Sequence, residues 1–242
     1  MAGRKKSAFN REDLHEHRLP DPTDIGEGEF AKSRQTRTRI MEAAVELLAS
    51  SGYSSMSTTE VARRAGLTRA AMLYHFPSRM SLIEAVVHYV TRKRVEMYGD
   101  AMANIVPDAK YFDRAIDFAW EQLRTQEFLA FSELSTAART DPELSAVFTP
   151  ALAEFDRARR ATALKLFPKQ HVEAPWFDLR RDITRFLLEG LAQQGGMAFD
   201  AERRTAELIE FLKALAMEPA AEAVFKRAKD SAARRRRRAG KS

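Results

Sequence analysis

Hydrophobic residues recur three and four positions apart through most of the chain after residue 33, which is the spacing of one face of a helix. No segment alternates apolar and polar residues as a half-buried strand would, and no hairpin turn is evident. Residues 1–33 lack the helical period and mix proline, glycine and charged residues, which is typical of a disordered segment. The pattern therefore predicts an all-α fold preceded by a disordered N-terminal arm.

Residues 34–80 are expected to form three helices separated by tight turns. The first has one apolar face and ends at Gly52. The second starts at a capping box, in which a hydroxyl caps the helix and Glu60 reaches back to the N–H of the capping residue. Gly66 ends this short helix, and Thr68 caps the third. Two short helices joined by so tight a turn are typical of a helix-turn-helix, whose second helix enters the major groove of DNA.

The rest of the chain is expected to be helical in longer segments. Residues 81–220 form the predicted second domain, and the arginine-rich residues 221–242 form a basic tail that we expect to be disordered, because its charges repel one another. The candidate helices of this part are residues 80–98, 111–139, 142–166, 176–194 and 201–217.

Charge is distributed unevenly along the chain. The 242 residues carry a formal net charge of +6, whereas residues 31–98 alone carry +6 and residues 99–223 carry −6. A basic block followed by an acidic one suggests that only the first faces a polyanion, which it would bind through salt-sensitive phosphate contacts. The plain alternative is that helices have charged outer faces, and charge alone does not decide between the two.

Composition narrows the remaining classes of protein. There is no cysteine, so neither a disulfide framework nor a thiolate metal site is possible, which suits a reducing compartment. No stretch approaches the roughly 18 consecutive apolar residues of a membrane span, and the basic start lacks the apolar core of a secretory signal. We therefore expect a cytoplasmic protein with no membrane partner. No phosphate loop, nucleophile elbow or paired zinc motif is present, so we expect no enzyme, no metal and no cofactor.

The segment from Arg34 to Arg94 resembles the DNA-binding domain of the tetracycline-repressor (TetR) family. The matching residues, in the order and spacing that the family uses, are Arg39-Ile40, Ala43-Ala44, Leu47-Leu48, Gly52-Tyr53, Thr58, Val61-Ala62, Ala65-Gly66-Leu67-Thr68, Tyr74-His75-Phe76-Pro77-Ser78-Arg79 and Leu82. A match of roughly sixty residues is far more specific than a lone short motif. The resemblance implies an N-terminal three-helix helix-turn-helix domain, followed by a helical ligand-binding and dimerisation domain.

One position departs from the family pattern. The family usually has Tyr where this chain has Leu73, and that Tyr commonly contacts a phosphate. Tyr74 lies one position further along, about 100° round the helix. It therefore either replaces that contact or reaches a different atom.

The resemblance also implies which residues contact DNA. Arg69 is expected to bind a base edge, most naturally a guanine, and Ala70 and Ala71 to contact a thymine methyl group. The residues expected to contact phosphates, which set register but not sequence, are Thr58, Thr68, Tyr74, His75 and Arg79. Two of these have a structural alternative: Thr68 as a helix cap alone, and His75 as a structural histidine.

Large apolar residues of the second domain are candidates for an effector pocket, since aromatic side chains commonly line such pockets. These candidates are Met102, Trp120, Phe128, Phe131, Phe148 and Phe155. The alternative for each is an ordinary filled core. Two late amphipathic helices are candidates for a dimer interface, because the family pairs its last two helices with their copies. Their candidate interface residues are Ile183, Phe186, Leu187, Leu191, Leu208, Phe211, Leu212 and Leu215.

Together these features predict a sequence-specific transcriptional regulator, most often a repressor, that binds a palindromic double-stranded operator as a homodimer. A small apolar or amphipathic effector would control it by favouring one spacing of the recognition helices over another. Two rival interpretations remain. One is a non-specific architectural DNA-binding protein that uses the basic block and the arginine run, and the other is a helical interaction protein whose helix-turn-helix has lost DNA binding.

Overall fold

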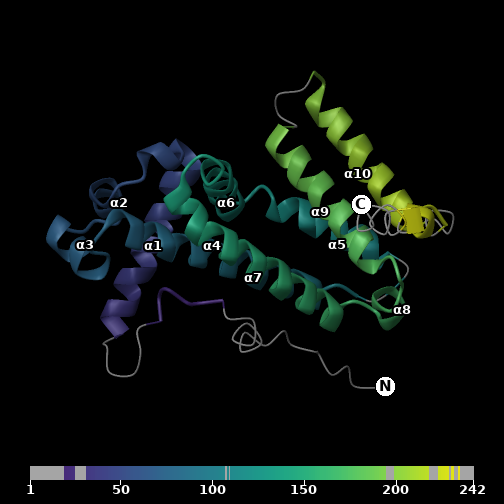
Figure 1. Cartoon of the computed structure of the whole chain (residues 1–242), viewed down its shortest axis with the longest axis horizontal. Helices are drawn as coiled ribbons and strands as arrows, with labels where there is room; N and C mark the ends of the chain where they lie inside the picture. The colour runs from purple at the N-terminus through teal and green to yellow at the C-terminus, as the bar shows by residue number, and fades with distance from the viewer. Residues whose placement is uncertain are drawn as a thin grey trace. The chain divides into compact units, whose positions relative to one another are not determined.

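The computed structural model describes residues 19–24, 31–106, 108, 110–194, 199–217, 223–228, 230–231 and 234. Most of these residues are helical and none of them forms a strand (Figure 1), so the predicted all-α fold is confirmed. In chain order the elements are α1 (Ala31–Ser51), η2 (Tyr53–Ser55), α2 (Thr58–Arg64), α3 (Arg69–His75), α4 (Arg79–Ala103), α5 (Tyr111–Gln122), α6 (Gln126–Ala137), α7 (Pro142–Leu166), α8 (Lys169–Val172), α9 (Phe177–Gln194) and α10 (Ala201–Met217). None of the described helices is both long and apolar enough to cross a bilayer.

Tertiary contacts divide the chain into two compact units. The first unit comprises residues 1–103 and 124–162, and so holds α1 to α4, α6 and most of α7. The second unit comprises residues 104–123 and 163–242, and holds α5 and α8 to α10. The functional boundary drawn from the sequence after residue 80 stays a prediction, and helix α4 runs from just before it to Ala103.

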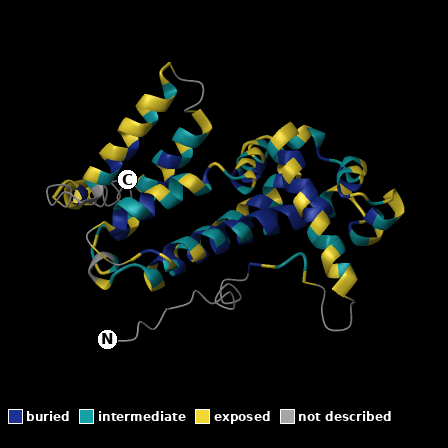
Figure 2. Cartoon of the chain, turned by 180° about the vertical axis from the view of Figure 1, so that it is seen from behind, coloured by how far each residue is buried: buried dark blue, intermediate teal, exposed yellow. Residues whose placement is uncertain are grey.

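One hydrophobic core holds the first unit together. The apolar face of α1 is fully buried in it, including Ile40 and Leu48, and α4 contributes Leu82 and Val86. Helix α6 packs along both α1 and α4 and adds Leu134. Figure 2 shows these buried residues as a continuous band along α1 and α4. Because α2 packs on α1 and α3 on α2, the short helices rest on this core.

The region predicted as one helix over residues 111–139 is instead two helices, α5 and α6. The chain turns at Leu123, whose N–H donates to the carbonyl of Trp120 at 3.1 Å. The hydroxyl of Thr125 then accepts a hydrogen bond from the N–H of Phe128 and caps α6. A hydroxyl cap starts a new helix without a glycine or proline between the two, which is why the periodicity concealed the break.

The N-terminal arm is described only in part, since residues 1–18 and 25–30 lie outside the described residues. Residues 19–24, which we call the strap, pack on the first unit. Leu19 is 2% exposed and contacts Val95 of α4 and Phe155 of α7. Burial of a leucine side chain stabilises a fold by roughly 1.5–3 kcal/mol relative to its exposure to water. This burial helps to hold in place a stretch that the sequence indicated to be disordered.

Polar contacts fasten the strap at its other positions. The Nη1 of Arg92 donates to the carbonyl of Leu19 at 3.3 Å, and the Nε of Arg37 donates to the carbonyl of Pro22 at 2.6 Å. Arg34 pairs with Asp24. Since Arg34 and Arg37 belong to α1 and Arg92 to α4, the strap ties the start of α1 to the middle of α4.

The second unit has an aromatic core. The rings of Tyr111, Phe112 and Phe167 lie 5.2 to 5.9 Å apart, and Arg180 of α9 places its guanidinium 4.2 Å from the centre of the Phe112 ring. Lys213 of α10 pairs with Asp117 of α5 at 2.7 Å. These contacts hold α9 and α10 against α5 while leaving much of α10 exposed (Figure 2).

Candidate nucleic-acid interface

Helix α2 begins at a hydroxyl cap, as the sequence predicted. The Oγ of Ser57 accepts a hydrogen bond from the N–H of Glu60 at 3.1 Å. The carboxylate of Glu60 binds Arg63 and Arg64 of the same helix. Its hydrogen bond with Arg63, helped by the charges of both arginines, lowers the pKa of Glu60 to about 2. The positive charge of Arg63 and Arg64 is therefore partly neutralised by Glu60, and Arg64 also pairs with Glu46 of α1 at 2.8 Å.

The turn between α2 and α3 is a Schellman motif centred on Gly66. Its φ of 64° lies in the left-handed region that favours glycine. The N–H of Leu67 donates to the carbonyl of Ala62 at 2.9 Å, and the N–H of Gly66 donates to that of Arg63 at 3.2 Å. These two bonds satisfy carbonyls at the end of α2 and fix the direction in which α3 leaves it.

A side chain of α1 closes this turn from inside. The Nη2 of Arg39 donates to the carbonyl of Ala65, and a Cβ at Gly66 would lie 3.2 Å from the same nitrogen. Glycine at this position therefore serves both the backbone angle and the close approach of Arg39. The sequence reasoning assigned Arg39 to the family pattern but had no signal for this contact, because its partner lies 26 positions away.

Helix α3 is anchored on one side and open on the other. The hydroxyl of Thr68 caps it by accepting from the N–H of Ala71 at 3.1 Å. Met72 is fully buried and Phe76, at its C-terminal end, is 2% exposed. The opposite side consists of Arg69, Ala70 and Tyr74, and we call these three residues the α3 outer face.

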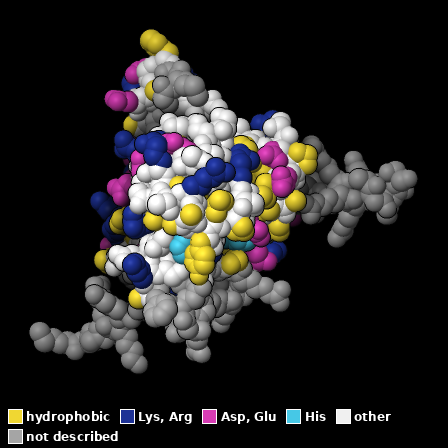
Figure 3. All heavy atoms as spheres, turned by 90° about the vertical axis from the view of Figure 1, so that its left-hand side faces the viewer, with side chains coloured by type: hydrophobic (Ala, Val, Ile, Leu, Met, Phe, Trp, Pro, Cys, Tyr) yellow, Lys and Arg dark blue, Asp and Glu magenta, His cyan; other side chains and the backbone are white. Residues whose placement is uncertain are grey.

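The side chains of the α3 outer face are exposed to solvent. Tyr74 is 77% exposed, although tyrosine usually buries much of its ring. Arg69 and Ala70 are exposed as well, and among the described residues Arg69 forms no hydrogen bond or ion pair. The ring of His75 lies 5.2 Å from that of Tyr74 in an edge-on arrangement. Figure 3, which views the side that carries α2 and α3, shows Lys and Arg side chains interspersed with hydrophobic and acidic ones.

Arg79 lies next to α3 and is exposed, but its guanidinium binds groups of the protein itself. Its Nε donates to the carbonyl of Met56 at 2.7 Å, and its guanidinium carbon lies 4.7 Å from the centre of the Tyr53 ring. The hydroxyl of Tyr53 donates to Asp141 at 2.8 Å, and burial together with this bond raises the pKa of Tyr53. The phosphate contact of Arg79 stays a prediction; in the structure Arg79 joins the start of α4 to η2 and, through Tyr53, to the start of α7.

Thr58, the remaining predicted contact, is half-buried at the first turn of α2, and Ala71 is half-buried on α3. The structure therefore places all eight predicted DNA contacts on one continuous stretch of α2, α3 and the start of α4.

The predicted pocket residues are mostly buried, and their role as pocket walls stays a prediction. Phe128, Phe131, Phe148 and Phe155 are at most 5% exposed, Met102 is 2% exposed and Trp120 is half-buried. Three of the rings surround the guanidinium of Arg94, with ring centres 4.1 to 5.2 Å from its central carbon. Sequence reasoning missed Arg94, since an arginine among aromatic residues carries no periodic signal of burial.

The predicted interface residues divide between buried and exposed positions. Leu212 is 2% exposed and belongs to the core of the second unit, whereas Leu187, Leu191 and Leu215 are half-buried. The exposed members, which we call the α9–α10 face, are Ile183 (36%), Phe186 (63%), Leu208 (37%) and Phe211 (62%).

Comparisons with known proteins agree with this geometry. The family model described as bacterial regulatory proteins, tetR family, matches residues 40–86, from the middle of α1 to the start of α4. An uncharacterized HTH-type transcriptional regulator of Mycobacterium tuberculosis (strain ATCC 25618 / H37Rv) is 24% identical over 144 residues, which cover 57% of this chain and 74% of that protein. These similarities are to transcriptional regulators and not to enzymes.

Solved structures share the fold. A putative TetR-family transcriptional regulator from Rhodococcus sp. has a TM-score of 0.54 and 18% identity, and the match covers 74% of this chain and 99% of that one. A putative transcriptional regulator from Saccharomonospora viridis, in complex with choline, also has a TM-score of 0.54, at 19% identity, with 73% of this chain and 96% of that one covered.

Proposed function

This chain is a transcriptional regulator of the tetR family with a helix-turn-helix DNA-binding domain, and on that premise we propose that it represses transcription by binding a palindromic operator as a homodimer under the control of a small-molecule effector. Residues 34–80 form the DNA-binding domain in this proposal, and residues 81–220 the ligand-binding and dimerisation domain.

The observation that carries the proposal is the two-sided character of α3. Met72 and Phe76 hold the helix on the core, while the α3 outer face is free to meet a partner. A helix presented in this way fits a major groove about 12 Å wide. Arg69 reads a guanine and Ala70 and Ala71 contact thymine methyl groups, because their side chains lie on the first turn of the recognition helix.

Phosphate contacts fix the position of this helix on the duplex. The start of this helix carries Thr68, and its end carries Tyr74 and His75. Thr58 lies at the start of α2, where backbone N–H groups favour an anion. Arg79 can offer a phosphate only those guanidinium N–H groups that it does not donate to the carbonyl of Met56.

The α9–α10 face supports the homodimer. Two phenylalanines that are more than 60% exposed cost free energy in water, and a second copy would cover them. Two-fold pairing presents two α3 helices to two half-sites, which is why the operator is expected to be palindromic.

An effector acts in this scheme only if it favours the conformation of one DNA-binding state over the other. A protein of similar fold holds choline, which supports a small organic molecule as the kind of compound to test. Titrating candidate effectors into the protein–operator complex would show release, or retention, as a shift in operator affinity.

The first experiment selects bound fragments from genomic DNA and footprints them with the full chain. A palindromic footprint supports the proposal, whereas protection along the whole fragment favours the architectural alternative, and no protection contradicts DNA binding altogether. On the selected operator, Arg69→Ala should weaken binding by about 1–3 kcal/mol and relax the base preference at one position in each half-site. Arg63→Ala is the matched control, because Arg63 is exposed nearby but paired with Glu60.

A further inference from the structure

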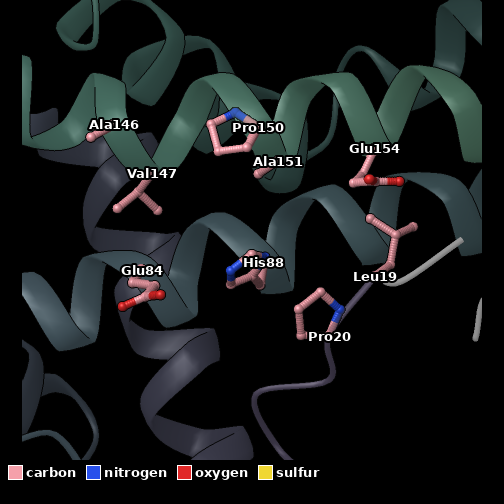
Figure 4. Close-up of a pocket in the computed structure, with 9 residues that line it drawn as sticks. All are labelled: Leu19, Pro20, Glu84, His88, Ala146, Val147, Pro150, Ala151 and Glu154. Carbon is pink, nitrogen blue, oxygen red and sulfur yellow. The ribbon is translucent and has the colours of Figure 1, made fainter.

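A cavity of about 220 Å³ opens in the first unit between α4, α7 and the strap (Figure 4). Helix α4 contributes Glu84 and His88, and the strap contributes Leu19 and Pro20. One side of α7 forms the facing wall, which ends at Glu154. None of the aromatic residues predicted to line a pocket lies in this wall, so the cavity is a separate feature of the first unit.

The charged groups that line the cavity are all acidic. Glu84 and Glu154 are carboxylates, and no lysine or arginine is among the lining residues. Glu154 accepts a hydrogen bond from Arg157 at 3.2 Å. Glu84 is exposed and, among the described residues, forms no ion pair with a lysine or arginine. The carboxylate at this end of the cavity is therefore available to a cation.

His88 adds an unsatisfied polar atom to the same wall. Its Nδ1 is buried and has no hydrogen-bond partner among the described residues. Burial lowers the pKa of His88 below its usual 6.5, although the charge of Glu84 acts in the opposite direction. The imidazole is consequently neutral at neutral pH, and it offers a nitrogen acceptor rather than a positive charge.

Helix α7 lines the cavity with Pro150, which lies within the helix. Proline has no N–H, so it gives no hydrogen bond to the carbonyl of Ala146 one turn earlier. Both residues line the cavity. The rest of the wall is apolar and includes Val147 and Ala151, so the cavity combines hydrogen-bond acceptors and negative charge with a hydrophobic surface.

We propose that this cavity binds a small amphipathic ammonium compound, a primary or secondary amine in its protonated form with a compact hydrophobic part. The ammonium N–H groups donate to the carboxylate of Glu84 and to His88, and the hydrophobic part packs against Leu19, Pro20 and Val147. Its role as the effector rests on the proposed function, whereas the binding itself does not.

The strap provides the route from this cavity to the DNA-binding helices. Leu19 and Pro20 form one wall, and the next residues of the strap bind α1 through Arg34 and Arg37. The opposite wall belongs to α4, which begins four residues after α3 ends. A ligand that changes how the strap packs on α4 therefore changes how α1 is held at its first turns.

The test measures direct binding to the full chain by isothermal titration calorimetry at pH 7.5. The probes are 2-phenylethylamine, 2-phenylethanol, which has the same size without charge, and 3-phenylpropionate, which carries the opposite charge. We expect one amine to bind per chain, about tenfold tighter than the alcohol, and the anion to bind most weakly. No binding by any probe, or equal binding of amine and alcohol, overturns the proposal.

Two variants locate the site. Glu84→Gln should bring amine affinity down to that of the alcohol and leave the alcohol unchanged. Ala146→Trp should abolish binding of both, because it fills the cavity from an exposed position where the fold tolerates a larger side chain. Glu143→Gln, an exposed carboxylate on α7 outside the cavity, is the control and should bind as wild type does. Unchanged amine binding in both test variants contradicts the assignment.

Operator footprinting of the same preparations separates the two proposals. A protein that protects a palindromic operator but binds no amine refutes the cavity inference alone. A protein that binds the amine with the predicted variant pattern but protects no operator refutes the proposed function and leaves the cavity site in place. Where both hold, the amine should shift operator affinity, and Ala146→Trp should remove that shift.

Discussion

The α3 outer face and the α9–α10 face are both exposed, yet they are built from different side chains. The first carries a charge, a small residue and a hydroxylated ring, whereas the second carries isoleucine, leucine and two phenylalanines. Groove recognition relies on hydrogen bonds and charge at a polar, hydrated surface. Pairing of protein chains relies on apolar area at the centre of the contact. The contrast fits the two partners proposed above, duplex DNA for one face and a second copy of the chain for the other.

The strongest test of this contrast introduces charge into the apolar face. The double variant Phe186→Glu, Phe211→Glu should weaken the dimer by roughly 4 kcal/mol or more, since central aromatic residues dominate such contacts and an unpaired carboxylate is costly to bury. Analytical ultracentrifugation would report the change. Phe199→Glu is the control, because Phe199 is 90% exposed but lies outside the α9–α10 face. If the double variant pairs as tightly as wild type, the face serves another purpose.

The next largest effect is expected beneath α3, where the outer face depends on its anchor. Met72→Ala removes a fully buried side chain and should lower the free energy of unfolding of the first unit by about 3 kcal/mol. Urea denaturation would measure this loss. Ala70→Ser, on the outer side of the same helix, should change stability far less. Equal losses in the two variants would mean that α3 is not two-sided.

A smaller effect distinguishes capping from DNA contact at Thr68. Thr68→Ala should cost about 1 kcal/mol of stability, because the N–H of Ala71 loses its acceptor. Thr68→Ser keeps the hydroxyl and should restore most of that stability. If operator affinity falls with Thr68→Ala by more than the stability loss explains and recovers with Thr68→Ser, the hydroxyl also contacts phosphate. A Thr68→Ala variant as stable as wild type would contradict the cap.

The smallest effect concerns pH and the charge of α2. The pKa of Glu60 is lowered to about 2 in the folded protein, below its usual 4.5. A carboxyl group of this kind contributes stability that is present above its unfolded pKa and is lost as pH falls towards the folded one. Stability should therefore decline between about pH 4.5 and 2, and Glu60→Gln should make this part of the profile flatter. Identical acid profiles for the two proteins would show that the Glu60 pairs contribute nothing.

Local signals made much of this fold predictable. The bounds of α7 and α10 follow from a capping aspartate with proline and from uninterrupted periodicity, and the hydroxyls of Ser57 and Thr68 identify the starts of α2 and α3. Each of these features depends on residues within a few positions of one another, so a single sequence reveals them.

What could not be predicted depends on contacts between distant residues. The position of the strap depends in part on Leu19 meeting Phe155, more than a hundred positions away, and the position of the Arg79 guanidinium depends on the carbonyl of Met56. The cavity at Glu84 and His88 likewise needs α4, α7 and the strap together. Helical periodicity reports which side of a helix is apolar, but it does not report what that side meets.

The anchoring of α3 by Met72 also bears on how such a regulator changes over time. Since the side chains of Arg69 and Ala70 take no part in the core, replacing them should, on the proposed function, alter which bases are favoured while leaving the scaffold intact. On that function, operator choice and folding are nearly independent properties of one short helix, so we expect that new binding preferences can be selected, in evolution or in the laboratory, without compensating changes elsewhere.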